Sequence, residues 1–407
     1  MDMRFPAEAE RFRAEVRSFL DEALPDDWAG VGVMDRDEAR EFAVKWREVL
    51  YENGYLGLTW PEEYGGGGRS KIDQIVLAEE LARARVPFGV LTDTTSVKMM
   101  GNTLVHFGTE EQKRTHLPRI MSGEEVWVQG YSEPGSGSDL ASLSLRAERD
   151  GDEWVLNGQK IWTSGATDGT HIFLLARTDP TAPKNHGISF LLCPLDARGV
   201  EVRPIMTLTH VEEFCEVFFT DVRIPVDHVV GAVNDGWTVA TGLLGFERGE
   251  EAATNPIWFR AELDRIIDMA RERGVIEDPL VRDRLAWCHT KVEIMRFLGY
   301  RILTQYLRDG RLGPEASISK LYWSEYHQEA VDLAMSILGA DALVRTGRRP
   351  VRFFRTDEPG APNTSNSWID VFLLNARAGT VYAGTSQVQR NILGEGMLGL
   401  PREPRPA

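Results

Sequence analysis

The sequence is poor in the residues that build disulfide frameworks and metal sites, with three cysteines and eight histidines among 407 residues. Cys193, Cys215 and Cys288 form no CxxC pair, which argues against a zinc ribbon or a disulfide scaffold and suits a reducing compartment. No two histidines are separated as in HxH or HxxxH. We therefore expect no metal site.

Long apolar runs and basic clusters are also missing. The sequence has no apolar run of about 18 residues and its N-terminus is charged and amphipathic, so we expect neither a membrane span nor a signal peptide. The formal net charge is −16 and there is no basic stripe, which argues against nucleic-acid binding but not against an anionic ligand in a local positive pocket. The sequence predicts a cytoplasmic protein, with peripheral membrane contact left open.

Common nucleotide-binding and hydrolase signatures are absent or misplaced. Gly394, Gly396 and Gly399 match GxGxxG, but no β-rich run precedes them and the chain ends eight residues after Gly399. A dinucleotide fingerprint needs a βαβ unit around it, so we interpret this match as the end of a helix. The sequence also contains no GxSxG elbow and no Walker loop.

The hydrophobic pattern divides the chain into three domains, namely an α-helical domain (1–125), a β domain (126–235) and a C-terminal α-helical bundle (236–407). Apolar residues recur at helical spacing in the first and the last. The middle domain has short β-rich runs separated by turn residues, which is typical of a barrel or a sandwich. These runs begin at Val126, Glu153, Ile172, Ile188 and Glu216.

The clearest helical runs of the third domain are Leu285–Leu307, Glu315–Leu338 and Trp368–Ala378. Between the last two, Arg345–Ser367 is rich in Arg, Pro, Asn and Thr, which predicts a surface loop. Gly65–Gly68 predicts a second loop.

Four segments carry recognisable motifs in a fixed order along nearly the whole chain. They are LVHFGTEEQKRTHLPRIMSGE (Leu104–Glu124), YSEPGSGSDL (Tyr131–Leu140), NGQKIWTSGA (Asn157–Ala166) and YAGTSQVQRNIL (Tyr382–Leu393). Together they resemble the acyl-CoA dehydrogenase family, whose TEPGAGSD, NGxKxWITNG and YEGTxxIQR signatures are similar to the last three. The resemblance implies an N-terminal α-helical domain, a middle β-barrel domain and a C-terminal four-helix bundle.

The resemblance also implies an activity. Such a protein uses FAD to dehydrogenate an acyl-CoA thioester to the trans-2-enoyl-CoA and passes the electrons to an electron-transfer flavoprotein. A homotetramer, or a mixed tetramer with a related subunit, is expected. By the same resemblance, FAD would be held by Tyr131, Ser132, Trp162, Ser164, Thr385 and Gln387, and the CoA portion of the substrate would contact Ser138.

The physical sense of these motifs does not depend on the family. Reduced flavin gathers negative charge near N1 and O2, so backbone N–H groups and hydroxyls beside the ring suit it. Gly135 and Gly137 form a turn whose backbone can approach a ligand closely. The competing interpretation is an ordinary turn between strands, and Trp162 taken alone would be a core aromatic.

Abstraction of the α proton of a thioester needs a carboxylate base. In many family members this base is the Glu of YEGT, but here that position is Ala383. A second group of members places the base on a helix of the C-terminal bundle, just before an arginine, and Glu247 followed by Arg248 matches that position. We therefore expect Glu247 to be the base and Arg248 to shape the acyl-CoA site. The backbone N–H of Ala383 would still hold the thioester oxygen.

Periodicity supports this choice only in part. Ala240, Leu243 and Leu244 precede Glu247 by seven, four and three residues and lie roughly on its side of a helix, where desolvation raises a carboxylate pKa. A stripe through Val239, Leu243 and Phe246 would instead leave Glu247 at a solvated edge or paired with an arginine. The nearest arginines are Arg248 and Arg260, and the nearest competing carboxylates are Glu250 and Glu251.

Two FAD contacts of the family look altered. Where many members carry Arg-x-x-Phe, this chain offers Arg271 or Arg273 without a correctly spaced phenylalanine, and Ser336 and Ala340 replace a Gln and a Gly. A non-catalytic or half-site partner subunit of a mixed oligomer and a flavin oxidase or monooxygenase therefore remain as alternatives. The sequence leaves open whether the acyl chain is straight, branched or sterol-derived.

Overall fold

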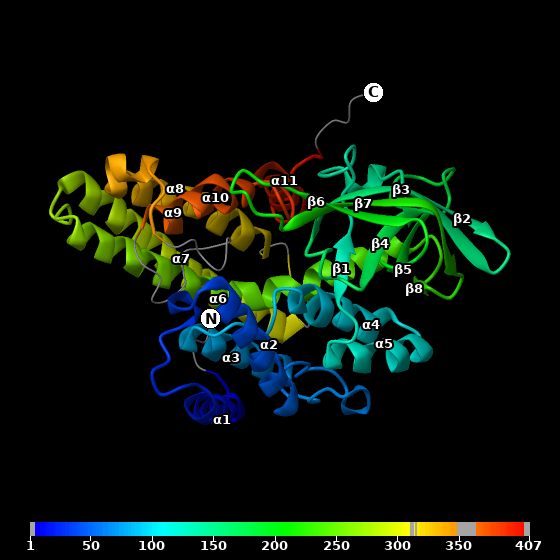
Figure 1. Cartoon of the computed structure of the whole chain (residues 1–407), viewed down its shortest axis with the longest axis horizontal. Coiled ribbons are helices and arrows are strands. Elements are labelled where there is room, and N and C mark those ends of the chain that lie inside the picture. The colour runs from blue at the N-terminus through cyan, green and yellow to red at the C-terminus, as the bar shows by residue number, and fades with distance from the viewer. Residues whose placement is uncertain (1–4, 310–312, 314–315, 348–363, 403–407) are drawn as a thin grey trace. The chain divides into compact units, whose positions relative to one another are not determined.

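The computed structural model describes residues 5–309, 313, 316–347 and 364–402. The chain forms two compact units, one made of residues 1–43, 71–87 and 248–407 and the other of residues 44–70 and 88–247. Helices build the first unit, whereas the second combines helices with all of the described strands (Figure 1).

The N-terminal part of the first unit is held by buried charges. Helix α1 (Ala7–Ala23) buries one face, from which Arg13 reaches α3 (Lys71–Ala84). The Arg13 guanidinium lies 2.9 Å from the Glu79 carboxylate and 2.5 Å from that of Glu80, and Arg17 lies 2.7 Å from Glu80. Buried charges of this kind require such pairing, so these contacts set how α1 packs on α3.

The second unit begins with short helices and continues as a sheet. Its helical elements are the end of α2 (Arg36–Glu52), η2 (Glu62–Tyr64), the π-helix η3 (Thr94–Gly101), α4 (Asn102–Phe107), α5 (Glu110–Ser122) and η4 (Leu140–Ser142). The strands are β1 (Trp127–Gly130), β2 (Arg146–Asp150), β3 (Glu153–Ser164), β4 (His171–Arg177), β5 (Ile188–Pro194), β6 (Val200–Ile205), β7 (Phe214–Pro225) and β8 (Val229–Val230).

The eight strands form one sheet in the order β6-β7-β3-β2-β4-β5-β8, and β1 pairs with β4 in parallel. One face of the sheet encloses a single apolar cluster to which every strand contributes. The strands at the two ends of the order take part as well, through Val202 of β6 and Val229 of β8. The sheet therefore curves around its own core.

The C-terminal helices of the first unit share another core. Helices α6 (Gly236–Glu272), α7 (Pro279–Asp309), α8 (Ala316–Leu338) and α9 (Ser365–Leu373) all contribute to it. Pro256 lies inside α6 and has no N–H to donate, so the Ala252 carbonyl loses its usual helical partner. A Cβ added at Gly299 of α7 would lie 2.2 Å from that carbonyl oxygen, so α6 and α7 can approach this closely only because residue 299 is glycine. The remaining elements are η1 (Val31–Val33), η5 (Gly339–Leu343), α10 (Asn375–Ala378) and α11 (Ser386–Gly396).

The expected fold class is confirmed, with helices first, a sheet in the middle and a helical bundle last. The predicted β-rich runs are strands, although the sequence analysis missed β2, β6 and β8. The predicted helix Trp368–Ala378 is interrupted at Leu374, which separates α9 from α10. The predicted loop Arg345–Ser367 extends too far, since α9 begins at Ser365, and its residues 348–363 lie outside the described part.

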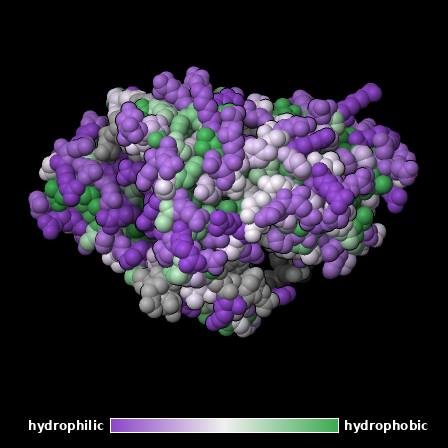
Figure 2. Space-filling model, turned by 90° about the horizontal axis from the view of Figure 1, so that it is seen from below, coloured by the Kyte–Doolittle hydropathy of each residue, from purple (hydrophilic) through white to green (hydrophobic). Residues whose placement is uncertain are grey.

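The surface agrees with the charged composition. On the face shown in Figure 2, hydrophilic residues predominate and hydrophobic residues form small separate groups. Among the described residues, no helix combines the length and the apolar character needed to cross a membrane.

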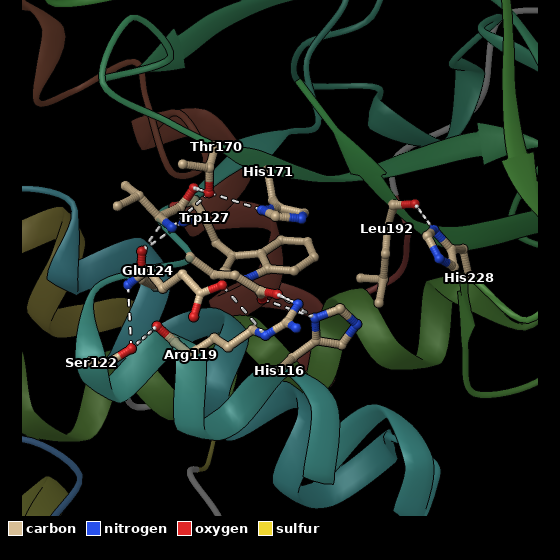
Figure 3. Close-up of polar contacts among 12 residues, drawn as sticks. His116, Arg119, Ser122, Glu124, Trp127, Thr170, His171, Leu192 and His228 are labelled. Carbon is tan, nitrogen blue, oxygen red and sulfur yellow. Dashed lines mark hydrogen bonds and ion pairs between the residues drawn. The ribbon is translucent and has the colours of Figure 1, made fainter. Parts of the chain in front are cut away.

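A buried carboxylate anchors the start of the sheet. Glu125 is only 3% exposed. Its carboxylate accepts a hydrogen bond from the Trp127 indole at 3.0 Å and lies 2.8 Å from Nδ1 of His116 and 3.5 Å from Arg119. Figure 3 shows the Trp127 indole between the His116 and His171 rings, and the His171 ring stacks on it at 4.7 Å. Burial opposes ionisation of Glu125, but the hydrogen bond and charge of His116 hold its pKa below the ordinary value.

We expect Glu125→Gln to lower the free energy of unfolding by about 3 kcal/mol at neutral pH, because it leaves buried donors without a charged acceptor. A carboxylate with a depressed pKa stabilises above its unfolded pKa, and this contribution is lost as the pH falls through the folded value. The melting temperatures of the variant and the wild type should therefore differ most above about pH 4.5 and converge only as the pH falls below it. Glu124→Gln is the matched control, because that side chain is 66% exposed and should change the melting temperature little.

Candidate active site

Two motif segments lie side by side at one end of the second unit. The Ile161 N–H of β3 donates to the Ser132 carbonyl, just after β1, at 2.9 Å. Ser132 and Ser164 are both half-buried. The structure therefore brings together the Tyr131–Leu140 and Asn157–Ala166 segments, which the sequence analysis assigned to flavin contacts.

Trp162 departs from regular strand geometry. Its φ is 64°, and the pairing of β3 with β7 shifts register between Lys160 and Thr163. A bulge of this kind re-aims a side chain. The indole is 57% exposed and its edge meets Phe214 at 6.0 Å between ring centroids. The alternative that Trp162 is a core aromatic is therefore wrong, and a large exposed ring beside two serines suits a planar ligand.

A buried ion pair holds these two segments together. The Lys160 ammonium has a fully buried side chain and donates to the Glu133 carboxylate at 2.8 Å and to the Tyr131 carbonyl at 3.1 Å. Burial lowers the pKa of Lys160 to about 8, and the Glu133 charge offsets part of that effect. For Glu133, burial is outweighed by the charge and hydrogen bond of Lys160, which keep its pKa below the ordinary value. Both groups are therefore charged at neutral pH.

Glu133 also holds the turn that follows. Its carboxylate accepts hydrogen bonds from the Ser144 N–H at 2.7 Å and the Leu145 N–H at 2.9 Å, and its backbone exchanges two hydrogen bonds with Ser136. The turn at Gly135 and Gly137 is exposed, as is Ser138, the expected CoA contact. The EPGSGSD segment is therefore a turn, as the competing interpretation predicted. The buried Glu133 carboxylate fixes the geometry of this turn.

The Tyr131 side chain faces the interior. Its ring meets Phe173 and Phe190 edge-on at 6.1 and 6.5 Å and is 8% exposed. Burial raises the pKa of its hydroxyl. A flavin contact by this residue is therefore better assigned to its backbone than to its ring.

The sequence analysis missed Glu213, which precedes β7. It is 8% exposed, its backbone carbonyl accepts from the Gly165 N–H at 2.9 Å, and both carboxylate oxygens lack a hydrogen-bond partner among the described residues. Burial raises the pKa of Glu213 to about 7. The period-2 alternation of this stretch could have found it, because Glu213 is in phase with the buried Val211, Cys215 and Val217, whereas its neighbour Glu212 is exposed.

The turn of the fourth motif lies in the first unit. Ala383 has a left-handed φ of 51° and the following Gly384 has a φ of 88°. The Gln389 amide donates to the Ala383 carbonyl at 3.0 Å, and the Lys320 ammonium donates to the Gly384 carbonyl at 2.7 Å. Within the described residues, the Ala383 N–H has no acceptor, and the residue is exposed. This N–H is therefore free to bind a ligand oxygen.

A pocket of about 650 Å³ opens beside this turn. Thr385 and Gln387, both expected FAD contacts, contribute to its wall. The Thr385 hydroxyl accepts from the Val388 N–H at 3.1 Å and so caps α11, which leaves its own proton available to a ligand. The neighbouring Ser386 is 5% exposed and its hydroxyl has no partner in the described part of the chain.

The other side of the pocket joins aromatic rings with cations. Lys291 lies over the rings of Trp287 at 5.1 Å and Tyr322 at 4.7 Å, and Arg390, which pairs with Glu325, lines the same pocket, as do Glu325 and Glu329. Flat rings suit a heteroaromatic base and Lys291 suits a phosphate, while Glu325 and Glu329 balance the two positive charges of the pocket. The sequence carried no signal for this group, because its members come from α7, α8 and α11.

The expected base cannot be located by its side chain. Glu247 and Arg248 lie in the continuous helix α6, but their side chains are outside the described residues. Val239, Ala240 and Leu243 are all buried, so the described members of both apolar stripes face the interior, whereas the side chains of Leu244 and Phe246 lie outside the described residues. Of the competing carboxylates, Glu250 accepts from the Gln74 amide at 3.4 Å.

The arginines expected to replace the Arg-x-x-Phe segment are engaged elsewhere in the chain. Arg271 pairs with Asp268 at 2.7 Å, and Arg273 pairs with Asp341. Within the described residues, no group of three or more His, Cys, Asp or Glu side chains is placed to hold a metal ion.

Family models match almost the whole chain. The N-terminal domain of acyl-CoA dehydrogenase matches residues 6–124, the middle domain residues 129–222 and the C-terminal domain residues 234–398.

Individual relatives are similar over their full length. "Acyl-CoA dehydrogenase IpdE1" of Mycobacterium tuberculosis strain H37Rv is 40% identical over 400 residues, covering 97% of this chain and 99% of the relative. A chain of the "Tcur3481-Tcur3483 steroid ACAD" structure is 37% identical with a TM-score of 0.79, covering 99% of this chain and 100% of that chain. A chain of the ChsE4-ChsE5 complex from Mycobacterium tuberculosis is 32% identical with a TM-score of 0.78, at 99% and 100% coverage.

We expect Lys160→Met to lower the free energy of unfolding by about 3 kcal/mol, because it leaves the Glu133 carboxylate buried without a counter-charge. Thermal unfolding followed by circular dichroism measures the loss. The double variant Lys160→Met with Glu133→Gln should recover part of it, and Lys184→Met, which removes an exposed partner of Asp139, should change little. A double variant that loses the sum of the two single effects would contradict this account.

We expect Glu213→Gln to change the pH dependence of stability. A carboxyl whose pKa rises to about 7 on folding destabilises the fold as the pH rises from about 5 to 8, by up to about 3 kcal/mol. The variant should therefore melt at the same temperature as the wild type near pH 5 and at a higher temperature near pH 8. Glu212→Gln, at the exposed neighbour, should follow the wild type throughout.

Proposed function

The chain belongs to the acyl-CoA dehydrogenase family and is an oxidoreductase of that kind, and on this premise we propose that FAD is its cofactor and that its product is a trans-2-enoyl-CoA. An electron-transfer flavoprotein would take the electrons. The observation that carries the proposal is the exposed Trp162 indole on its bulge, beside Ser132 and Ser164. The buried Lys160–Glu133 ion pair holds the strand that carries Trp162. Binding of a flat ligand requires such a fixed ring, whereas an ordinary turn does not.

FAD fits the described residues in two places. In the second unit, Trp162 offers a ring face, and the Ser132 and Ser164 hydroxyls suit the polar edge of a flavin. In the first unit, the pocket at Thr385 and Gln387 joins flat rings, which suit an adenine, with Lys291, which suits a phosphate, and Glu325 and Glu329 also line it. The buried Ser386 hydroxyl, which has no described partner, supports a ligand at this pocket.

The catalytic roles follow from chemistry. Flavin, when bound, accepts the β hydrogen of the acyl chain together with its electron pair. We assign abstraction of the α proton to Glu247, because Ala383 has no carboxylate and Glu247 precedes an arginine on a bundle helix. The free N–H of Ala383 would bind the thioester oxygen, Arg248 would shape the acyl site, and Ser138 would contact CoA.

A bulky, steroid-derived acyl-CoA is the substrate class that we propose. One similar structure is named a steroid ACAD. A base on α6 rather than in the Tyr-Ala-Gly-Thr turn agrees with a bulky or branched acyl chain by family analogy.

We further propose a mixed oligomer in the cytoplasm, with three functional domains at residues 1–125, 126–235 and 236–407. The two similar structures each carry two subunit names. Arg271 and Arg273 are paired within the chain, which favours completion of the FAD site by a different subunit. The partner-subunit alternative therefore remains the second candidate.

The decisive experiment is anaerobic mixing of the flavin-loaded protein with straight, branched and steroid-derived acyl-CoAs while flavin absorbance is followed. We expect the steroid-derived thioesters to bleach the flavin fastest. Glu247→Gln should slow bleaching at least roughly a hundredfold without loss of flavin, because a general base is removed.

Two variants make the assignment specific. Glu272→Gln changes an exposed carboxylate of the same helix and should bleach like the wild type. A large loss in Glu250→Gln with a small one in Glu247→Gln would transfer the role to Glu250. If the chain binds flavin only after co-expression with a related subunit, and that complex keeps its activity with Glu247→Gln, the partner-subunit function is correct.

A further inference from the structure

The turn of the fourth motif is held in an unfavourable conformation by side chains from two helices. Ala383 has a φ of 51°, in the left-handed region that costs a non-glycine residue about 1 kcal/mol or more. Such a conformation persists only where surrounding contacts over-determine it. Here those contacts are the hydrogen bonds from Gln389 to the Ala383 carbonyl and from Lys320 to the Gly384 carbonyl.

Of the two side chains that hold the turn, Lys320 costs more free energy to bury than Gln389. It is a residue of α8 that is 6% exposed, and an ammonium in such a position loses much of its hydration. Its hydrogen bond to the Gly384 carbonyl is 2.7 Å long, a charge-assisted contact. The ammonium also lies 5.8 Å from the centre of the Tyr382 ring, at the other end of the turn. A charged donor binds a carbonyl more strongly than a neutral amide does.

The same turn presents a donor with no acceptor. Ala383 is exposed and its N–H is unbonded within the described residues, one residue before the carbonyl that Lys320 holds. Backbone donors held in advance at developing negative charge are among the strongest contributions to catalysis. A positive charge behind such a donor strengthens it.

We propose that Lys320 is a positioning residue for the dehydrogenation: it holds the Ala383 N–H in place for the thioester oxygen and supplies a positive charge where that oxygen becomes negative. This inference rests on the proposed function. The α C–H bond breaks, its proton goes to the Glu247 carboxylate, and its electron pair is shared between the α carbon and the thioester oxygen. The pair then forms the double bond as the β hydrogen leaves with its own pair to the flavin.

The test compares Lys320→Met, Lys320→Arg and Lys45→Met, the last an exposed lysine of α2 that serves as control. With the best thioester found, kcat and KM are measured, together with α-proton exchange into the thioester in D2O. We expect Lys320→Met to lower kcat and α-proton exchange together by roughly ten- to a hundredfold, with KM and flavin content within threefold. Lys320→Arg should recover most of the loss, and Lys45→Met should match the wild type.

Amide hydrogen exchange of the 380–390 peptide provides a second readout that needs no substrate. In Lys320→Met, this peptide should exchange at least tenfold faster than in the wild type. If no thioester is oxidised by the wild type, the proposed function fails, while this exchange still tests whether Lys320 holds the turn. If Lys320→Met does not fold, Gln389→Met, which removes the second contact, must show the same split between kcat and KM.

Three results would overturn the inference. Lys320→Met could keep its kcat, or raise KM alone, and the residue would then not act on the transition state. Unchanged exchange of the 380–390 peptide would show that Lys320 does not hold the turn. A loss of kcat that Lys320→Arg fails to recover would show that the charge has no part.

Discussion

The ion pair between Lys160 and Glu133 is the contact on which the packing of the Tyr131–Leu140 segment against β3 depends. One ammonium joins the Tyr131 carbonyl to the Glu133 carboxylate, and that carboxylate in turn orders the backbone at Ser144. A charge buried this completely is tolerated only with a partner in good geometry. Movement of either segment would therefore leave a charge buried without its partner, at a large cost in free energy. The Trp162 bulge is rigid for this reason.

Charge is used in the same way in the first unit. Lys320 holds the Gly384 carbonyl, while Ala383 next to it is in a left-handed conformation that alanine seldom adopts. The family's usual glutamate is absent from this turn, but the backbone donor remains. Alanine in place of that glutamate makes the side chain at this position smaller, which agrees with the bulky substrate proposed.

Much of this could be predicted from the sequence, because the deciding signals are local. The change from helical to strand periodicity at residue 126 and back at residue 236 depends on neighbouring residues, and β1 begins at Trp127 and α6 at Gly236. Short strands were missed where local contrast is weak. In β2 (Arg146–Asp150), for example, four of the five residues are charged and only Ala147 is apolar, so its pattern resembles a loop.

The sequence by itself determined the order of the domains, the family and the motif residues, since each rests on spacing along the chain. Only the tertiary structure decided that Tyr131 turns its ring inward whereas Trp162 exposes its own. It also placed Lys320 of α8 against Gly384, 64 residues later in the chain. Burial and long-range pairing depend on residues that are distant in sequence, and no local pattern carries that information.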